Sequence, residues 1–93
     1  MRDYWVYIMT NIGNTVLYTG VTNNLERRVR QHKAGTGSAF ASRYKTHKLV
    51  FDERFVRITD ALAAEKRIKA GSRAKKVKLI EEGNPQWNDL LTG

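Results

Sequence analysis

Residues 4–24 read YWVYIMTNIGNTVLYTGVTNN and contain two short strand-like runs separated by a turn-forming segment. The runs over residues 4–9 and 15–19 are rich in aromatic and β-branched side chains, which favour strands. Residues 10–14 supply the asparagines and glycine typical of turns, and Gly20 is predicted to end the second strand. Because the runs are short and close together, the segment predicts an antiparallel hairpin.

A helix is predicted directly after the hairpin. Asn23 or Asn24 can cap it, because an asparagine side chain accepts hydrogen bonds from the first backbone N–H groups of a helix. The helix is expected to run to about Lys33, and Gly35 is the candidate C-cap. A short helical turn is expected to follow over residues 40–44.

The second half of the chain predicts one more strand and two helices. Residues 48–56 form the expected third strand, whose apolar side chains lie on both faces, as in a covered strand. Thr59 or Asp60 is expected to cap a second long helix, and Ser72 a third that runs through Glu82. The apolar residues expected to hold the tail against the body are Trp87, Leu90 and Leu91.

The order β-β-α-β-α-α predicts an α/β (α+β) fold, a three-stranded antiparallel sheet flanked by helices. Ninety-three residues make one domain, residues 1–93, with a core over about residues 3–82 and a C-terminal tail over 83–93. A core of this size is thin, so each large apolar residue in it matters for stability.

The charge of the chain favours a polyanionic partner. Seventeen Lys and Arg face nine Asp and Glu, for a net charge of +8, and nucleic acid is the commonest polyanion that such surfaces attract. The alternative is a solvated basic surface that keeps the protein in solution. The chain has no cysteine, no apolar run as long as the ~20 residues of a membrane span, and no signal-peptide pattern, so a cytoplasmic protein without membrane contact is expected.

Polar side chains interrupt the apolar stripe of the first predicted helix. Leu25, Val29 and His32 share one face by their spacing, and Arg28 borders it. An arginine at such a position either finds a partner or lays its stem on the core and its head in water. A histidine there is more often a hydrogen-bonded core residue than a catalyst.

The second long helix repeats this pattern. Glu65 lies in its apolar face, three residues from both Leu62 and Ile68, where it either pairs with a basic residue or binds a metal ion. Tyr7 and Tyr18 on the hairpin are ordinary strand residues by propensity, and core packing is the default role for each of them. As a set, however, one carboxylate can hold one Mg²⁺ completed by water and phosphate oxygens, and an arginine suits the charge on a phosphoryl group.

These residues lie in an ordered series that resembles the GIY-YIG nuclease superfamily, most closely its small stand-alone YhbQ-like (UPF0213) group. The resemblance is carried by the segments YWVYI over residues 4–8, LYTGVT over 17–22, NLERRVRQH over 24–32, EKRIK over 65–69 and SRAKK over 72–76. Each motif alone is weak, and the strength of the resemblance lies in their order and spacing. It covers nearly the whole chain, to about residue 82.

The resemblance implies a role for each of five residues. Tyr7 corresponds to the general base or its relay to the attacking water, and Tyr18 to a residue that positions the phosphate and water. Arg28 corresponds to the arginine that stabilises the scissile phosphate, and His32 to a supporting or proton-relay histidine. Glu65 corresponds to the single metal-binding glutamate.

The chain departs from the family pattern at a few positions. The first signature reads Trp5-Val6-Tyr7 and the second Tyr18-Thr19-Gly20, so the tyrosines and the last glycine are retained. Gly20 is expected to let the backbone turn tightly beside the site. Thr22 replaces a lysine common in the family, which removes one positive charge.

The implied activity is a metal-dependent endonuclease that hydrolyses phosphodiester bonds in DNA, in repair or recombination, with one Mg²⁺ or Mn²⁺ ion and no obligate protein partner. Basic side chains would hold the flanking backbone, and solvation of a helix face is the alternative role for them. The residues expected to bind nucleic acid are Arg27, Lys66, Arg67, Lys69, Arg73, Lys75 and Lys76. Two rival hypotheses are a nucleic-acid-binding module that no longer cuts and an interaction domain without a nucleic-acid role.

Overall fold

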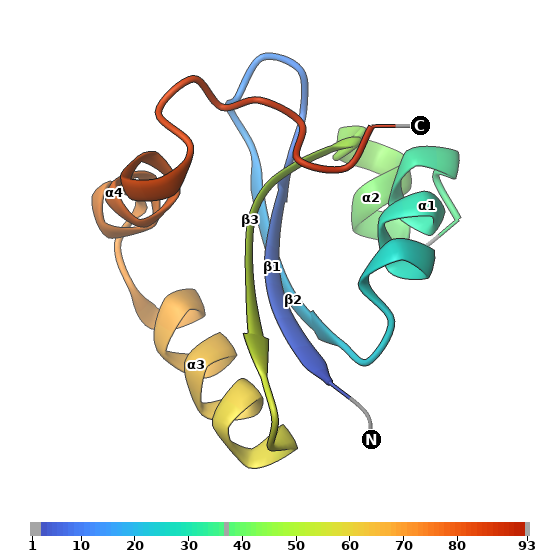
Figure 1. Cartoon of the computed structure of the whole chain (residues 1–93). Coiled ribbons are helices and arrows are strands. Elements are labelled where there is room, and N and C mark those ends of the chain that lie inside the picture. The colour runs from blue at the N-terminus through green and yellow to red at the C-terminus, as the bar shows by residue number, and fades with distance from the viewer. Residues whose placement is uncertain (1–2, 37, 93) are drawn as a thin grey trace.

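A computed structural model describes residues 3–36 and 38–92 and contains one antiparallel sheet of three strands (Figure 1). The strands are β1 (Tyr4–Thr10), β2 (Leu17–Thr22) and β3 (Lys48–Phe55), in the spatial order β2-β1-β3. β1 is therefore the central strand, and it pairs antiparallel with both neighbours. The predicted sheet is confirmed.

Helices cover both faces of the sheet. α1 (Leu25–Ala34) and the short α2 (Ala39–Tyr44) lie on one side, and α3 (Ile58–Ala70) and α4 (Arg73–Gly83) on the other (Figure 1). The predicted α+β class and order of elements are confirmed, with α2 at the place where a helical turn was expected. Among the described residues, no helix is long and apolar enough to cross a membrane.

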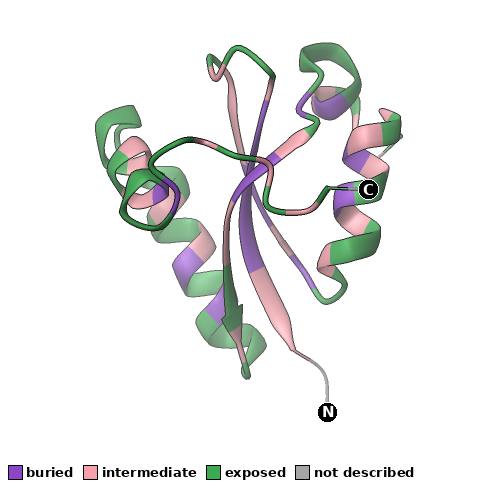
Figure 2. Ribbon diagram, turned by 45° about the horizontal axis from the view of Figure 1, so that its top comes forward, coloured by how far each residue is buried: buried purple, intermediate pink, exposed green. Residues whose placement is uncertain are grey.

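The central strand supplies most of the core, and its side chains alternate between the two faces. Tyr7 and Met9 pack with Val29 of α1, whereas Val6 packs on α3 and Ile8 on α4. All four of these β1 side chains are completely buried, as the colouring of β1 in Figure 2 illustrates. This double-sided burial holds Tyr7 rigidly against α1.

Three helix caps follow the local sequence as predicted. The Asn24 side chain accepts a hydrogen bond from the backbone N–H of Arg27, and Gly35 ends α1 in the left-handed conformation. The side chain of Ser72 caps α4 in the same way as Asn24 caps α1.

The expected start of the second long helix is wrong. α3 begins at Ile58, with Arg57 at the N-cap position and no side-chain hydrogen bond there. Thr59 and Asp60 therefore lie inside its first turn.

The predicted apolar face of α3 also needs correction, because Leu62 is 46% exposed while Ala61 and Ala64 are buried. The buried residues are the two alanines, which let α3 approach the sheet closely, and Ile68 packs beside them.

The predicted bounds of the second strand also need correction. The Asn11 side chain accepts hydrogen bonds from the backbone N–H groups of Thr15 and Val16, which holds both residues in the hairpin loop. β2 therefore begins at Leu17, and it continues through Gly20 instead of ending there, because Gly20 pairs with Tyr7 in the ladder.

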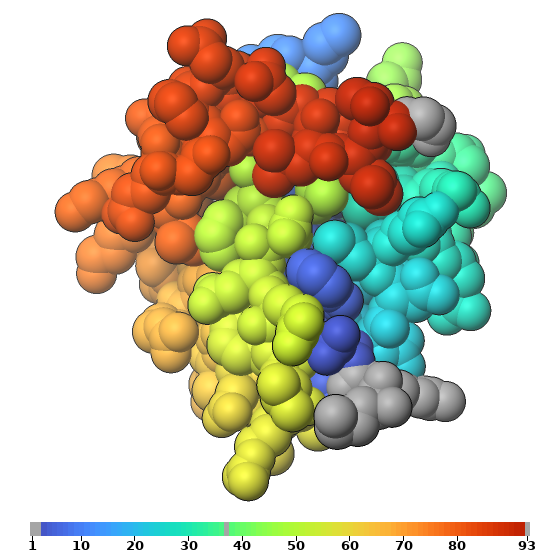
Figure 3. Space-filling model, viewed as in Figure 1, coloured from blue at the N-terminus to red at the C-terminus, as the bar shows by residue number. Residues whose placement is uncertain are grey.

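The C-terminal tail folds back as predicted and shields the free edge of β3. The backbone N–H of Leu90 donates to the carbonyl oxygen of Leu49 at 2.8 Å, and the Asn84 amide donates to the carbonyl of Val50 at 3.2 Å. Leu91 and Trp87 pack on the core, whereas the side chain of Leu90 is 45% exposed. Figure 3 shows the tail crossing from α4 toward α1.

The third strand is an edge strand, so it is less enclosed than its apolar pattern predicted. Leu49 and Val50 are buried, but the strand ends at Phe55. Val56 lies beyond that end and is 61% exposed.

Candidate active site

The site forms where the ring of Tyr7 crosses over Gly20. The two residues are direct partners in the β1–β2 ladder, and β2 is an edge strand. A Cβ atom placed on Gly20 would lie 2.5 Å from the hydroxyl oxygen of Tyr7 and 2.6 Å from the ring carbon that bears it. The glycine is therefore required for close approach of the ring, not for the tight turn that the sequence suggested.

His32 joins this hydroxyl to a buried threonine. Its Nε2 atom lies 3.3 Å from the Tyr7 hydroxyl, and its Nδ1 atom lies 3.2 Å from the hydroxyl oxygen of Thr46. All three side chains are at most 1% exposed. A neutral imidazole has one donor and one acceptor nitrogen, and both are satisfied when the Tyr7 hydroxyl donates to Nε2 and Nδ1–H donates to Thr46.

The environment of His32 keeps its ring neutral. Burial, followed by the positive charge of Arg28 and then His47, lowers the pKa of His32 to about 4. Burial disfavours the charged form, and nearby positive charges act in the same direction. The ring is therefore a proton acceptor at neutral pH.

Tyr18 completes the aromatic wall of the site. Its ring centroid lies 4.9 Å from that of His32 and 6.3 Å from that of Tyr7. On its other side the ring centroid of Phe40, in α2, lies 5.3 Å away. Tyr18 is half-buried, so it connects the enclosed Tyr7–His32 pair with the surface.

Two charged side chains influence the pKa of the Tyr7 hydroxyl in opposite directions. Burial and then the neighbouring Tyr18 raise the pKa of the Tyr7 hydroxyl to about 12, and the charge of Glu65 also raises it. The guanidinium of Arg28 acts in the opposite direction. Arg28 from α1 and Glu65 from α3 therefore both act on this hydroxyl, although the two helices lie on opposite faces of the sheet.

Glu65 is partly enclosed and has a cationic neighbour. Its side chain is 18% exposed, and one carboxylate oxygen lies 3.4 Å from the ammonium of Lys69, one helical turn away. Among residues 3–36 and 38–92, no group of three or more His, Cys, Asp or Glu side chains converges on one point. The donor set thus fits one hard cation held largely by water and substrate oxygens, and it does not fit a two-metal centre.

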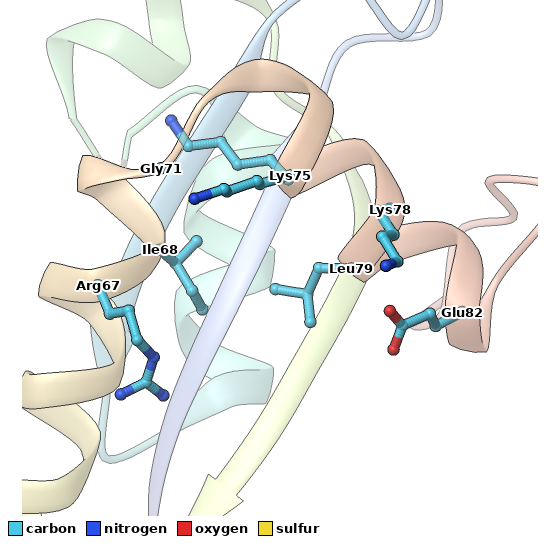
Figure 4. Close-up of a pocket in the computed structure, with 8 residues that line it drawn as sticks. Arg67, Ile68, Gly71, Lys75, Lys78, Leu79 and Glu82 are labelled. Carbon is cyan, nitrogen blue, oxygen red and sulfur yellow. The ribbon is translucent and has the colours of Figure 1, made fainter.

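A basic cleft opens between α3 and α4. It has a volume of about 250 Å³, and the side chains of Ile68 and Leu79 approach each other across it (Figure 4). Glu82 is the acidic side chain that lines it. The basic residues that line it are Arg67, Lys75, Lys76 and Lys78.

The remaining predicted nucleic-acid contacts lie elsewhere. Arg73 donates to the backbone carbonyls of Asn14 and Thr15 at 2.9 and 3.0 Å, so it fastens α4 to the hairpin loop. Lys69 pairs with Glu65, and Arg27 and Lys66 are exposed. The seven residues therefore do not form one surface, although three of them share the cleft.

Thr46 is the site residue that the sequence did not reveal. It precedes β3 and is completely buried, and its contact with His32 spans 14 positions of the chain. A single threonine before a strand carries no local signal for such a contact. Its role depends on how α1 packs beside β3, which only the fold establishes.

Comparison with known proteins places this site in a family. The GIY-YIG catalytic domain matches residues 3–78. A UPF0213 protein of Natronomonas pharaonis is 41% identical over 80 residues, which cover 86% of this chain and 93% of that protein. A UPF0213 protein of Staphylococcus haemolyticus is 39% identical over 82 residues, covering 88% and 99% of the two chains.

A solved structure supports the same assignment. The solution NMR structure of a UPF0213 protein from Bacillus halodurans matches with a TM-score of 0.60 and 26% identity, covering 98% of this chain and 99% of that one. The sequence resemblance is thus confirmed by a domain match, by close relatives and by the fold. The chain belongs to the GIY-YIG family, a superfamily of nucleases, and within it to the UPF0213 group.

Proposed function

We propose that this protein is a metal-dependent endonuclease that hydrolyses phosphodiester bonds in DNA. The observation that carries the proposal is the enclosed Tyr7–His32 pair beside the cation of Arg28, with the carboxylate of Glu65 close enough for its charge to act on the Tyr7 hydroxyl. Phosphodiester hydrolysis needs a proton acceptor for the attacking water and positive charge for the phosphoryl oxygens. The family of nucleases to which the chain belongs supports this chemistry.

The proton of the attacking water would leave through Tyr7 and His32. With a pKa of about 12, the Tyr7 phenol is protonated at neutral pH and does not act as a preformed base. It can instead accept the water proton on its oxygen while it passes its own proton to Nε2 of His32. The tyrosine then stays neutral, and the histidine takes up the proton.

Substrate binding would prepare His32 for this step. The charge of Arg28 is one cause of the low pKa of His32. A phosphate anion that pairs with Arg28 neutralises this charge, so the pKa of His32 would rise toward its ordinary value when the substrate binds. Arg28 thus has two proposed tasks, which are to hold the phosphoryl oxygens and to couple their arrival to the basicity of His32.

Glu65 would hold the divalent ion, Mg²⁺ or Mn²⁺. When bound, such an ion supplies charge stabilisation for the leaving oxygen. The carboxylate has to release Lys69 for this purpose, and an i,i+4 pair whose lysine is 55% exposed is weak enough to exchange. Lys69 would then be available for the flanking phosphate.

One observation favours the rival hypothesis of a module that binds nucleic acid without cutting it. Glu65 already has a cationic partner in Lys69. If Glu65 stays paired with Lys69 when the substrate binds, the basic cleft and Arg28 would bind the nucleic-acid backbone, and Glu65 would hold no metal ion for cleavage.

Cleavage assays separate the two functions. Purified protein should nick DNA with Mg²⁺ or Mn²⁺ and stop in a chelator. Arg28→Ala should lower the rate by on the order of 10²–10³-fold, as removal of one charge-stabilising donor does. Arg30→Ala is the matched control, because Arg30 lies on the same helix, pairs with Glu26 and is 68% exposed. Equal rates for both variants would point to a contaminating nuclease.

A further inference from the structure

A hollow of about 450 Å³ lies between the tip of the β1–β2 hairpin and the segment that joins α2 to β3. It is separate from the basic cleft and shares no lining residue with it. Its lining residues are Asn11, Ile12, Tyr44, Lys45, His47, Lys48 and Asp89.

Two large apolar side chains on different segments line this hollow while facing solvent. Ile12 in the hairpin loop is 94% exposed, and Tyr44 at the end of α2 is 40% exposed. A single exposed apolar residue is ordinary on a protein surface. Two of them lining the same hollow form a pair of apolar walls, which suits a flat apolar group inserted between them.

An aromatic ladder connects this hollow with the candidate active site. The Tyr44 ring centroid lies 4.7 Å from that of Phe40, which in turn lies 5.3 Å from that of Tyr18. Tyr18 contacts His32 at 4.9 Å between ring centroids. Three ring contacts therefore lead from the hollow to the enclosed His32.

The charges around the ladder favour an anion. The guanidinium of Arg43 lies 5.5 Å from the centre of the Tyr44 ring, and Lys45 and His47 beside it are exposed. The acidic lining residue, Asp89, is neutralised by Lys33 at 2.5 Å. Positive charge beside aromatic side chains on which bases can stack is the combination that holds unpaired nucleotides in proteins that bind single strands.

We propose that the hollow between Ile12 and Tyr44 binds one unpaired nucleobase of the substrate, with its phosphates on Arg43, Lys45 and His47. The nucleobase site rests on the proposed function, because the aromatic ladder would connect a base in the hollow with the scissile phosphate at Arg28. Bases in a duplex are stacked on each other and cannot enter without being extruded. The substrate class would then be nucleic acid with a single-stranded segment beside the cut.

Binding measurements in a chelator test this proposal without cleavage. The probes are a short DNA single strand that carries one 2-aminopurine and the same sequence as a duplex. Tyr44→Leu keeps apolar bulk and removes the ring, so it should weaken single-strand binding by about tenfold and abolish the fluorescence quenching of 2-aminopurine. Tyr44→Phe should retain both, and duplex affinity should change little in either variant.

Leu62→Ser provides the matched control, because Leu62 is similarly exposed at 46% but lies on α3. It should leave single-strand binding and quenching unchanged. Unchanged binding and quenching in Tyr44→Leu would overturn the proposal, as would an equal loss in Leu62→Ser.

The two proposals fail in different ways. A protein that binds single strands through Tyr44 but never cleaves DNA would refute the proposed function and support the nucleobase site. A protein that cleaves through Arg28 and Glu65, with the same KM for single strands in Tyr44→Leu as in wild type, would refute the nucleobase site alone.

Discussion

The hydroxyl of Tyr7 and the Nε2 atom of His32 lie 3.3 Å apart inside a core where both side chains are at most 1% exposed. The pair joins β1 to α1 and lies 25 positions apart in the chain. The imidazole also contacts Thr46 through Nδ1, so the hydrogen bonds at its two ring nitrogens are linked through the tautomer of the ring. The first prediction follows from this chain of three groups.

Thr46→Val should change the tautomer of His32. Valine keeps the shape of threonine but offers no acceptor for Nδ1–H, so the proton is expected to move to Nε2, which would then donate to Tyr7. The ¹⁵N chemical shifts of the ring, measured at neutral pH, report this change directly. We also expect a loss of about 1–3 kcal/mol in the free energy of unfolding, because the Nδ1 atom loses its partner.

Thr46→Ser is the control for this prediction, since serine keeps the hydroxyl and should keep the wild-type tautomer. If Thr46→Val retained a proton on Nδ1, the threonine would not be the group that orients the ring.

His32 should make the protein less stable in mild acid. Its pKa is about 4 in the folded state and about 6.5 in the unfolded state, so the unfolded chain binds more protons between these values. The free energy of unfolding should therefore fall as the pH falls from about 6.5 to about 4, by up to about 3 kcal/mol from this group, and the His32 contribution should level off below that.

Urea unfolding across this pH range measures the effect of His32. The variant His32→Gln should show a shallower slope than wild type, whereas His47→Gln, at an exposed position, should retain it. Parallel slopes in wild type and His32→Gln would contradict the low pKa.

Gly20→Ala should disturb the site even though alanine is small. Its methyl group would overlap the hydroxyl of Tyr7, which is held by packing on both sides of β1 and cannot move freely. Overpacking of this kind costs about 1–3 kcal/mol. Thermal unfolding should show the loss, and the NMR signals of the His32 ring should shift.

Gly13 supplies the comparison for this variant, because a Cβ atom there would have no neighbour closer than 3.9 Å. Gly13→Ala should be nearly neutral in the same measurements. A neutral Gly20→Ala would mean that the Tyr7 ring is more mobile than its burial indicates.

The architecture was predictable because most of its signals are local. Two strand-like runs around a turn, the cap at Asn24 and the cap at Ser72 each depend on a few neighbouring residues, and each has the predicted structure. The start of α3 was missed because no side chain caps it. The extent of β2 was missed because Asn11 delays its start and the Tyr7–Gly20 pairing extends it.

The sequence named candidate site residues, but it did not predict the contacts that connect them. Packing or ion pairing explains each residue singly, and the structure shows the ion-pair explanation for Glu65 in its contact with Lys69. Thr46 and the binding of Arg73 to the hairpin loop depend on contacts across 14 and more than 50 positions. Such contacts follow from the assembled fold.

The basic cleft should contribute to nucleic-acid binding through charge alone. Arg67→Gln and Lys75→Gln each remove one cation from the cleft. The slope of the logarithm of the DNA-binding constant against the logarithm of the salt concentration should therefore fall in magnitude by about 0.7–0.9 for every phosphate that the protein no longer neutralises. Arg54→Gln is the control, because Arg54 lies on β3 and pairs with Asp3 at 3.5 Å. Equal slopes for wild type and all three variants would exclude the cleft as a surface that binds nucleic acid.

The central claim is that Glu65 holds the metal ion on which cleavage depends. The most direct measurement is the rate of Mg²⁺-dependent DNA cleavage by Glu65→Gln, beside Glu26→Gln, which alters an exposed glutamate on α1. We predict a loss on the order of 10²-fold or more for Glu65→Gln and a rate within about twofold of wild type for Glu26→Gln. Cleavage by Glu65→Gln at the wild-type rate and the same Mg²⁺ dependence would contradict the claim.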